Sequence, residues 1–127
     1  MKGDAAVAVI CAGSYVATGA WALFGGDIAP PFDLVIGVKD AMIAGLCLAW
    51  LKAELDRGPL RARGIALVAA LVILADAFLA LIGGAGPWRT EIIPDGSLTG
   101  SLLVGVGLIA LGLGLVWFVR RPDPPAP

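Results

Sequence analysis

The segment Gly64–Gly84, GIALVAALVILADAFLALIGG, gives the clearest indication of the fold class of this chain. It runs for about 20 residues with a single charged side chain, Asp76, and a helix of that length reaches about 30 Å, the thickness of the hydrocarbon core of a bilayer. Backbone N–H and C=O groups find no water in lipid, so a segment that crosses it must satisfy them internally. The segment therefore predicts a transmembrane helix.

Three further segments have the same character: Ala5–Gly26, Leu34–Ala53 and Leu98–Val119. The chain of 127 residues is 59% hydrophobic and only 15% charged, with a mean hydropathy of +0.93. A soluble domain carries roughly 25% charged residues, so a globular protein with four buried helices fits poorly. The alternating pattern of barrel strands is absent. We predict an all-α fold: a four-transmembrane-helix bundle with antiparallel up-down topology, in one domain over residues 1–119.

The two ends of the chain carry separate expectations. We expect the first apolar segment to stay as a membrane helix and not to be cleaved as a signal peptide, because it is long and VATGA is a poor cleavage site. Residues 120–127, RRPDPPAP, form a proline-rich tail that we expect to be extended or disordered.

Basic residues predict the orientation in the membrane. One side of the bundle would hold Lys2, Lys52, Arg57, Arg61, Arg63, Arg120 and Arg121. The opposite loops hold Arg89 alone. Because cytoplasmic loops are enriched in Lys and Arg, both termini are predicted to be cytoplasmic, in a multi-pass protein of the inner (plasma) membrane.

Composition also excludes several functions. The net charge of -1 gives no basic face for nucleic acid. The chain has no histidine, and Cys11 and Cys47 form no CxxC pair, so we predict no metal site and no cofactor. The two cysteines fall at similar depths on their helices, and buried cysteines usually serve as small apolar side chains.

Small and aromatic residues suggest how the helices pack. Glycines recur with a spacing of seven in the last span, in the sets Gly100, Gly107, Gly114 and Gly105, Gly112. Small residues let helices approach closely in lipid, so these stripes predict packing within the chain, with a homodimer contact as the alternative. Trp21, Trp50 and Trp117 lie near helix ends, where tryptophan favours the membrane interface.

Three ionisable residues lie inside the predicted spans. Lys39 and Asp40 fall about 10 Å from the outer end of the second span, and Asp76 falls about 10 Å from the outer end of the third. Charge at that depth costs a few kcal/mol per residue, so we expect all three to face the bundle interior. Residues 39 and 40 point about 100° apart, so they would flank a cleft rather than aim at one point.

Other polar residues are candidates for the walls of such a site. They are Ser14, Tyr15 and Thr18 in the first span, Ser101 in the last, and Trp88 and Arg89 in the second outer loop. Serine and threonine side chains in helices often bond to their own backbone, which is the alternative role for Ser14, Thr18 and Ser101.

The stretch GVKDAMIAGLCLAW (37–50), followed by a basic loop and ALVAALVILADAFLALIGG (66–84), resembles a family of small four-helix membrane proteins of bacteria and fungi classified as a domain of unknown function. Members typically carry Gly-x-(Arg/Lys)-Asp in the second helix and an aspartate late in the third. Gly37, Lys39, Asp40 and Asp76 match these positions, with lysine where arginine is more usual. The resemblance implies a fold and a site but no reaction. Small multidrug transporters also have four helices, but their essential acid lies in the first helix, and the first span here has none.

Three functions remain open. The first is a site for a small lipophilic molecule, with acid–base chemistry in which one aspartate is the base, the other a protonated acid, and Lys39 orients them. Isomerisation, cyclisation or ring-opening would suit such a set. The second is proton- or ion-coupled transport by a dimer, because intramembrane carboxylates relay protons. The third is a structural or accessory membrane subunit.

Overall fold

The computed structural model describes residues 2–25, 28–56, 59–87, 89–92 and 98–121. Its described part is all-α, with four long helices and one short one. The long helices are α1 (Lys2–Phe24), α2 (Phe32–Leu55), α3 (Pro59–Ala85) and α5 (Leu98–Arg120), and the short one is α4 (Arg89–Ile92). All four long helices are long and apolar enough to cross a membrane, as the sequence predicted.

The helices differ from the predicted apolar spans by a few residues: α1 begins before Ala5 and ends at Phe24, and the other three long helices extend beyond their spans. α3 begins at Pro59 rather than at Gly64, because proline has no N–H to lose in the first turn and its fixed φ suits a helix start. α2 continues to Leu55 through the polar residues Lys52 and Glu54. Membrane thickness limits the apolar run, whereas the helix itself continues into the polar boundary layer. Of the predicted tail, residues 122–127 lie outside the described residues.

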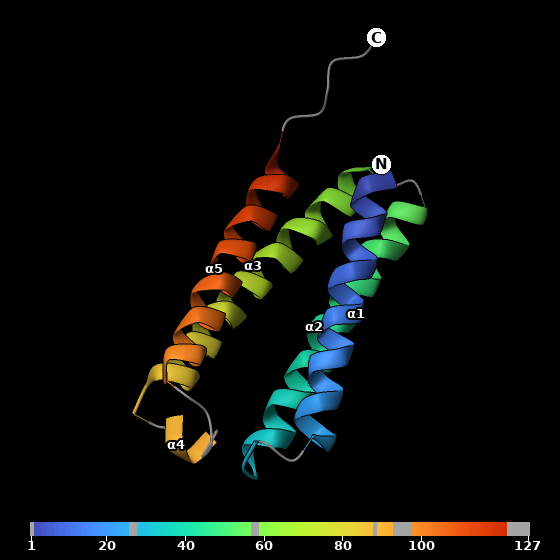
Figure 1. Cartoon of the computed structure of the whole chain (residues 1–127). Coiled ribbons are helices and arrows are strands. Elements are labelled where there is room, and N and C mark those ends of the chain that lie inside the picture. The colour runs from blue at the N-terminus through green and yellow to red at the C-terminus, as the bar shows by residue number, and fades with distance from the viewer. Residues whose placement is uncertain (1, 26–27, 57–58, 88, 93–97, 122–127) are drawn as a thin grey trace.

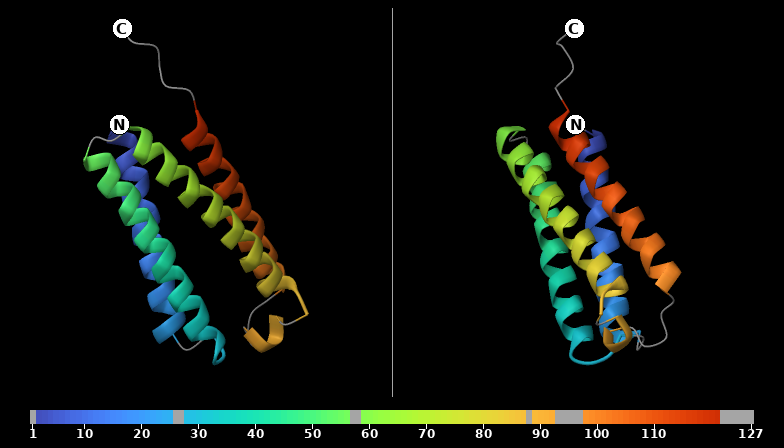
Figure 2. Two further views of the ribbon diagram at one scale, coloured as in Figure 1. Left: turned by 180° about the vertical axis from the view of Figure 1, so that it is seen from behind. Right: turned by 90° about the vertical axis from the view of Figure 1, so that its left-hand side faces the viewer.

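The long helices form two antiparallel hairpins. α1 packs against α2, α3 packs against α5, and contacts between α2 and α3 join the two pairs. The hairpins come together at the end where the chain begins and diverge toward the end that holds α4 (Figures 1 and 2). At the divergent end, the backbone N–H of Ala29 donates to the carbonyl of Ile92 at 3.0 Å, which connects α4 to the link between α1 and α2.

The core lies mainly at the end where the hairpins meet. One buried cluster takes a residue or more from each long helix: Ala8, Trp50, Ala66, Ala69, Ala70 and Val119. A second cluster, of Ala12, Ile43 and Cys47, lies beside the first, nearer the end of α1 and the start of α2. Cys11, Tyr15 and Ile73 pack against it. Small alanines let these helices approach closely, which is how helices associate in lipid without a hydrophobic driving force.

Trp50 corrects one sequence prediction. It is 1% exposed and belongs to the core, so it is not a lipid-facing residue of an aromatic belt. Its indole N–H donates to Glu54 Oε1 at 3.2 Å, one helical turn away, so the ring is buried while its polar atom is satisfied. Trp21 and Trp117 are exposed, which is compatible with the interface role.

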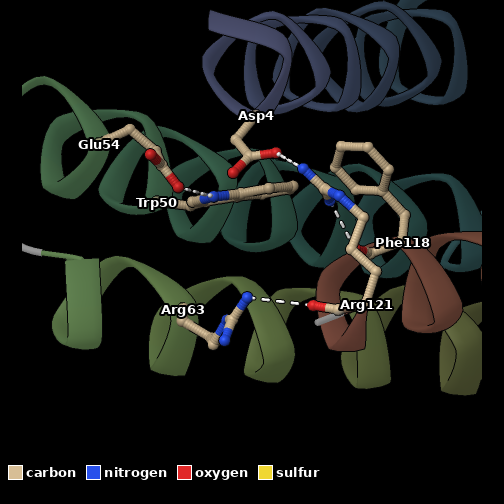
Figure 3. Close-up of polar contacts among 6 residues, drawn as sticks. All are labelled: Asp4, Trp50, Glu54, Arg63, Phe118 and Arg121. Carbon is tan, nitrogen blue, oxygen red and sulfur yellow. Dashed lines mark hydrogen bonds and ion pairs between the residues drawn. The ribbon is translucent and has the colours of Figure 1, made fainter. Parts of the chain in front are cut away.

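Charged residues close the end of the bundle where the hairpins meet (Figure 3). Arg121 Nη2 lies 2.8 Å from Asp4 Oδ1, which ties the end of α5 to the start of α1. The guanidinium of Arg121 also lies 3.8 Å from the centre of the Phe118 ring. Arg63 Nη2 on α3 donates to the carbonyl of Arg121 at 3.1 Å. Three helices therefore meet at Arg121.

The glycines of α5 divide into two sets. Gly105 and Gly112 are buried, and a Cβ on either would press against Leu81 or Leu74 of α3. Gly107 and Gly114 are exposed, and a Cβ on either would meet no atom within 4 Å. The first set explains the close packing of α3 and α5, in agreement with the prediction of packing within the chain.

Candidate functional site

The charged residues of the spans come together between α2 and α3. Lys39 and Asp40 lie about 10–12 Å along α2 from its first residue, and Asp76 lies about 13 Å before the last residue of α3. These two helices run in opposite directions, so the three side chains share one level of the bundle. That level follows directly after the second core cluster, where the hairpins begin to diverge.

Lys39 contacts both carboxylates. Its Nζ lies 2.5 Å from Asp76 Oδ1 on α3 and 3.4 Å from Asp40 Oδ1 on its own helix. The sequence predicted that Lys39 and Asp40 would flank a cleft because their Cα–Cβ bonds diverge. The ammonium reaches both acids all the same, because four methylene groups let it bend back toward its neighbour while it spans the gap to α3.

Tyr15 completes the environment of Asp76. Its hydroxyl donates to Asp76 Oδ2 at 3.0 Å, from α1 to α3. Lys39 lies at one oxygen of Asp76 and Tyr15 at the other, so this carboxylate joins three helices and both hairpins. We refer to Tyr15, Lys39, Asp40 and Asp76 below as the polar cluster.

Burial differs among the charged members of the polar cluster. Asp40 is 3% exposed and Asp76 is 8% exposed, although both are acids in an apolar bundle. The side chain of Lys39 is 33% exposed, so it is the least buried of the three charged residues of the cluster.

Gly19 makes room for Asp40. A Cβ at position 19 of α1 would lie 3.2 Å from Asp40 Cβ and 3.4 Å from the carbonyl oxygen of Gly37. The absence of a side chain thus lets α1 pack directly over the acid and seal it from lipid. Gly19 was not among the site residues predicted from the sequence. Its distance in the chain from Asp40 gave no signal that the two would meet.

The remaining predicted site residues contribute less to the cluster. The Ser14 hydroxyl donates to the carbonyl of Ile10 at 2.8 Å, so it bonds to its own helix backbone. The Thr18 hydroxyl donates to the carbonyl of Tyr15 at 3.3 Å, and the same side chain lies within hydrogen-bonding reach of Asp40. Ser101 packs beside Gly84 in the other hairpin. Arg89 begins α4, but its side chain and the whole of Trp88 lie outside the described residues.

The two cysteines are neighbours next to the polar cluster. Both are free thiols, Cys47 buried and Cys11 half-buried, and Cys11 packs against the core cluster that contains Cys47. Tyr15 packs against the same cluster, so the thiols form the apolar layer below it. Within the described ranges, no group of three or more His, Cys, Asp or Glu side chains is arranged to hold a metal ion.

The described part of the chain is thus a small four-helix protein whose four apolar helices are compatible with a multi-pass membrane protein. Comparison of the chain with protein families, with curated proteins and with solved structures gave no match. The resemblance to the four-helix family with Gly-x-(Arg/Lys)-Asp in its second helix therefore stays a prediction.

Proposed function

We propose that the polar cluster is an acid–base site that binds a small lipophilic molecule in the membrane. One observation carries the proposal: a single ammonium, on Lys39, is shared by two buried carboxylates, one of which also accepts a hydrogen bond from Tyr15. Polar contacts between membrane helices contribute about 0.6 kcal/mol each, whereas a charge deep in a span costs about 2.5–3.5 kcal/mol. Helix packing alone gives little reason to keep three such groups.

The charge balance assigns roles to the two acids. One ammonium neutralises one carboxylate, so the second is neutral only when it holds a proton or meets a cationic ligand. Asp76 has the shorter contact with Lys39 and accepts the Tyr15 hydrogen bond, so its charge is the better matched of the two. Asp40 is buried under Gly19 and lies further from the ammonium. Asp76 then acts as base, Asp40 as acid, and Lys39 orients them.

Proton transfer between such a pair suits a ligand with an acidic C–H or a polar carbonyl in an apolar frame. Isomerisation, cyclisation and ring-opening of a lipophilic molecule need one group to remove a proton and another to supply one. The side chain of Lys39 is 33% exposed, and the hairpins diverge toward the end of the bundle that holds α4, so the space between the hairpins is the proposed route of approach from the membrane.

Proton-coupled transport is the second candidate, and the position of the cluster favours it. Lys39 and Tyr15 both reach Asp76 across the boundary between the hairpins, so a change in the protonation of Asp76 would loosen the polar contacts that hold them together at this level. A dimer would be needed to enclose a pathway in a chain of this size. A third possibility is a structural or accessory subunit, in which the polar cluster only fixes the register of the helices. The experiments below test this role against the ligand site and the transporter.

The test compares Asp40→Asn with Asp33→Asn, a matched change at the outer end of α2. Purified wild-type protein and both variants are extracted with organic solvent, and the lipophilic compounds retained by each are measured by untargeted mass spectrometry. We expect Asp40→Asn to retain about tenfold less of a specific compound, because leaving a buried polar group without its hydrogen-bond partner costs about 1–3 kcal/mol. Asp33→Asn should retain as much as wild type.

Thermal unfolding of the same samples separates function from structure. Asn at position 40 removes the surplus carboxylate without changing its shape, so the melting temperature should stay close to that of wild type. An identical compound profile in all three proteins would refute the ligand site. A proton flux into wild-type proteoliposomes, measured with an entrapped pH dye and abolished by Asp40→Asn, would favour the transporter instead.

We also propose that both termini face the cytoplasm, in the inner (plasma) membrane, because the basic residues gather at one end of the bundle. The test uses a chain with Cys11 and Cys47 replaced by alanine and one new cysteine, from Asp56→Cys at the end of α2 or from Pro87→Cys beyond α3. A membrane-impermeant maleimide applied to intact cells should label the cysteine at 87 and leave that at 56 unmodified until the cells are lysed. The reverse labelling would invert the proposed topology.

A further inference from the structure

A pocket lies between α3 and α5 at the end where the hairpins meet. Its volume is about 220 Å³, and it is lined by Arg63, Leu67, Val119 and Arg120. The arginines come from opposite helices, and the two apolar residues lie one turn or less further into the span. The pocket therefore has a cationic rim at the membrane boundary and an apolar floor that continues toward the hydrocarbon.

We propose that this pocket binds the headgroup of an acidic glycerophospholipid from the surrounding bilayer. Guanidinium groups match phosphate oxygens in charge and geometry, and they stack and pair more readily than lysine ammonium groups do. Basic pockets between membrane helices suit anionic headgroups, while the floor contacts the first carbons of the acyl chains. A free anion would use the rim but would leave the half-buried Leu67 of the floor uncovered.

One side of the rim is held in place. Arg63 Nη2 donates to the carbonyl of Arg121 at 3.1 Å, and Arg121 is itself paired with Asp4 at 2.8 Å (Figure 3). A guanidinium that is already oriented loses less side-chain entropy when a phosphate arrives. Val119 belongs to the buried core, so this part of the floor is fixed too. Arg120 completes the rim from the exposed face of α5.

The experiment uses the full chain in a neutral detergent, with phosphatidylglycerol, phosphatidylcholine or inorganic phosphate as the probe. Bound lipid is counted by native mass spectrometry during titration. Arg120→Gln and Arg63→Gln are compared with Arg61→Gln, an exposed arginine of α3 that does not line the pocket. We expect each pocket variant to bind phosphatidylglycerol about fivefold more weakly, since each basic residue near an anionic surface contributes about 1 kcal/mol.

Each outcome decides the proposal. Tight binding of phosphatidylglycerol, weak binding of phosphatidylcholine, no competition by inorganic phosphate and an unaffected Arg61→Gln variant would support it. Equal losses in Arg61→Gln and Arg120→Gln would show general surface attraction, and full competition by phosphate would show a site for the free anion; either would overturn it. Arg120→Gln is the decisive variant, because Arg63→Gln also removes the bond to the end of α5.

Discussion

Asp76→Ala should lower the free energy of unfolding by about 2–3 kcal/mol, because it leaves the ammonium of Lys39 without its nearest carboxylate. Breaking a fully buried pair costs about 3–5 kcal/mol, and the loss here is smaller because Lys39 is 33% exposed and keeps Asp40 at 3.4 Å. The Tyr15 hydroxyl also loses its acceptor. Unfolding by titration with a denaturing detergent, followed by helical circular dichroism, measures the change.

Removing the stranded charge should recover much of that stability. In the double variant Lys39→Met/Asp76→Ala, an apolar side chain of similar length replaces the ammonium, so no uncompensated cation remains in the span. Asp33→Ala, at the outer end of α2, is the matched control and should change stability by less than about 0.5 kcal/mol. A double variant no more stable than Asp76→Ala alone would contradict the assignment of the ion pair.

Gly105→Ala and Gly112→Ala should each destabilise the protein by about 1–3 kcal/mol, the usual cost of overpacking. A Cβ at Gly105 would lie 2.5 Å from Leu81 Cδ1 and 3.1 Å from Leu81 Cα. At Gly112 it would lie 2.9 Å from Leu74 Cδ1 and 3.0 Å from Leu74 Cα. The Cα atoms cannot rotate away as a side chain can, so α3 and α5 must separate. The same unfolding titration measures the loss.

Gly107→Ala and Gly114→Ala are the controls on the same helix. An added Cβ there meets no atom within 4 Å, and alanine favours helix over glycine, so stability should be unchanged or slightly higher. Equal losses at all four positions would show that α5 does not pack on α3 by the Gly105 and Gly112 face. If Gly107→Leu lowered the measured molecular mass of the detergent complex to that of a monomer, the predicted homodimer would use the other face.

The fold could be predicted from the sequence because the bilayer imposes a length. In about 20 apolar residues without a proline, a helix is the only structure that satisfies the backbone hydrogen bonds in lipid. Each of the four spans could therefore be predicted from its own residues. α4 was not predicted, since four residues in a polar loop carry no such constraint. Nor did the sequence show which of the two glycine sets on α5 would face α3, because both have the same spacing.

The candidate site was only partly readable. Counting residues from the helix ends placed Lys39, Asp40 and Asp76 at one level, because a helix has a fixed rise per residue and consecutive spans run in opposite directions. The role of Tyr15 as a hydrogen-bond donor to Asp76 depends on how α1 is rotated, which counting does not give. The same ignorance of rotation led Trp50 to be assigned to the interface, although it is a core residue.

The contact between Lys39 and Asp40 has a consequence for how the protein is made. Chains leave the ribosome N-terminus first, so α2 reaches the bilayer before Asp76 on α3 does. During that interval Asp40, next in the chain and 3.4 Å away in the finished structure, is the one acid at hand for the lysine. A helix that brings its own counter-charge can partition from the translocon as a nearly neutral segment. The later arrival of α3 then adds Asp76 as the closer partner, while Asp40 stays in contact.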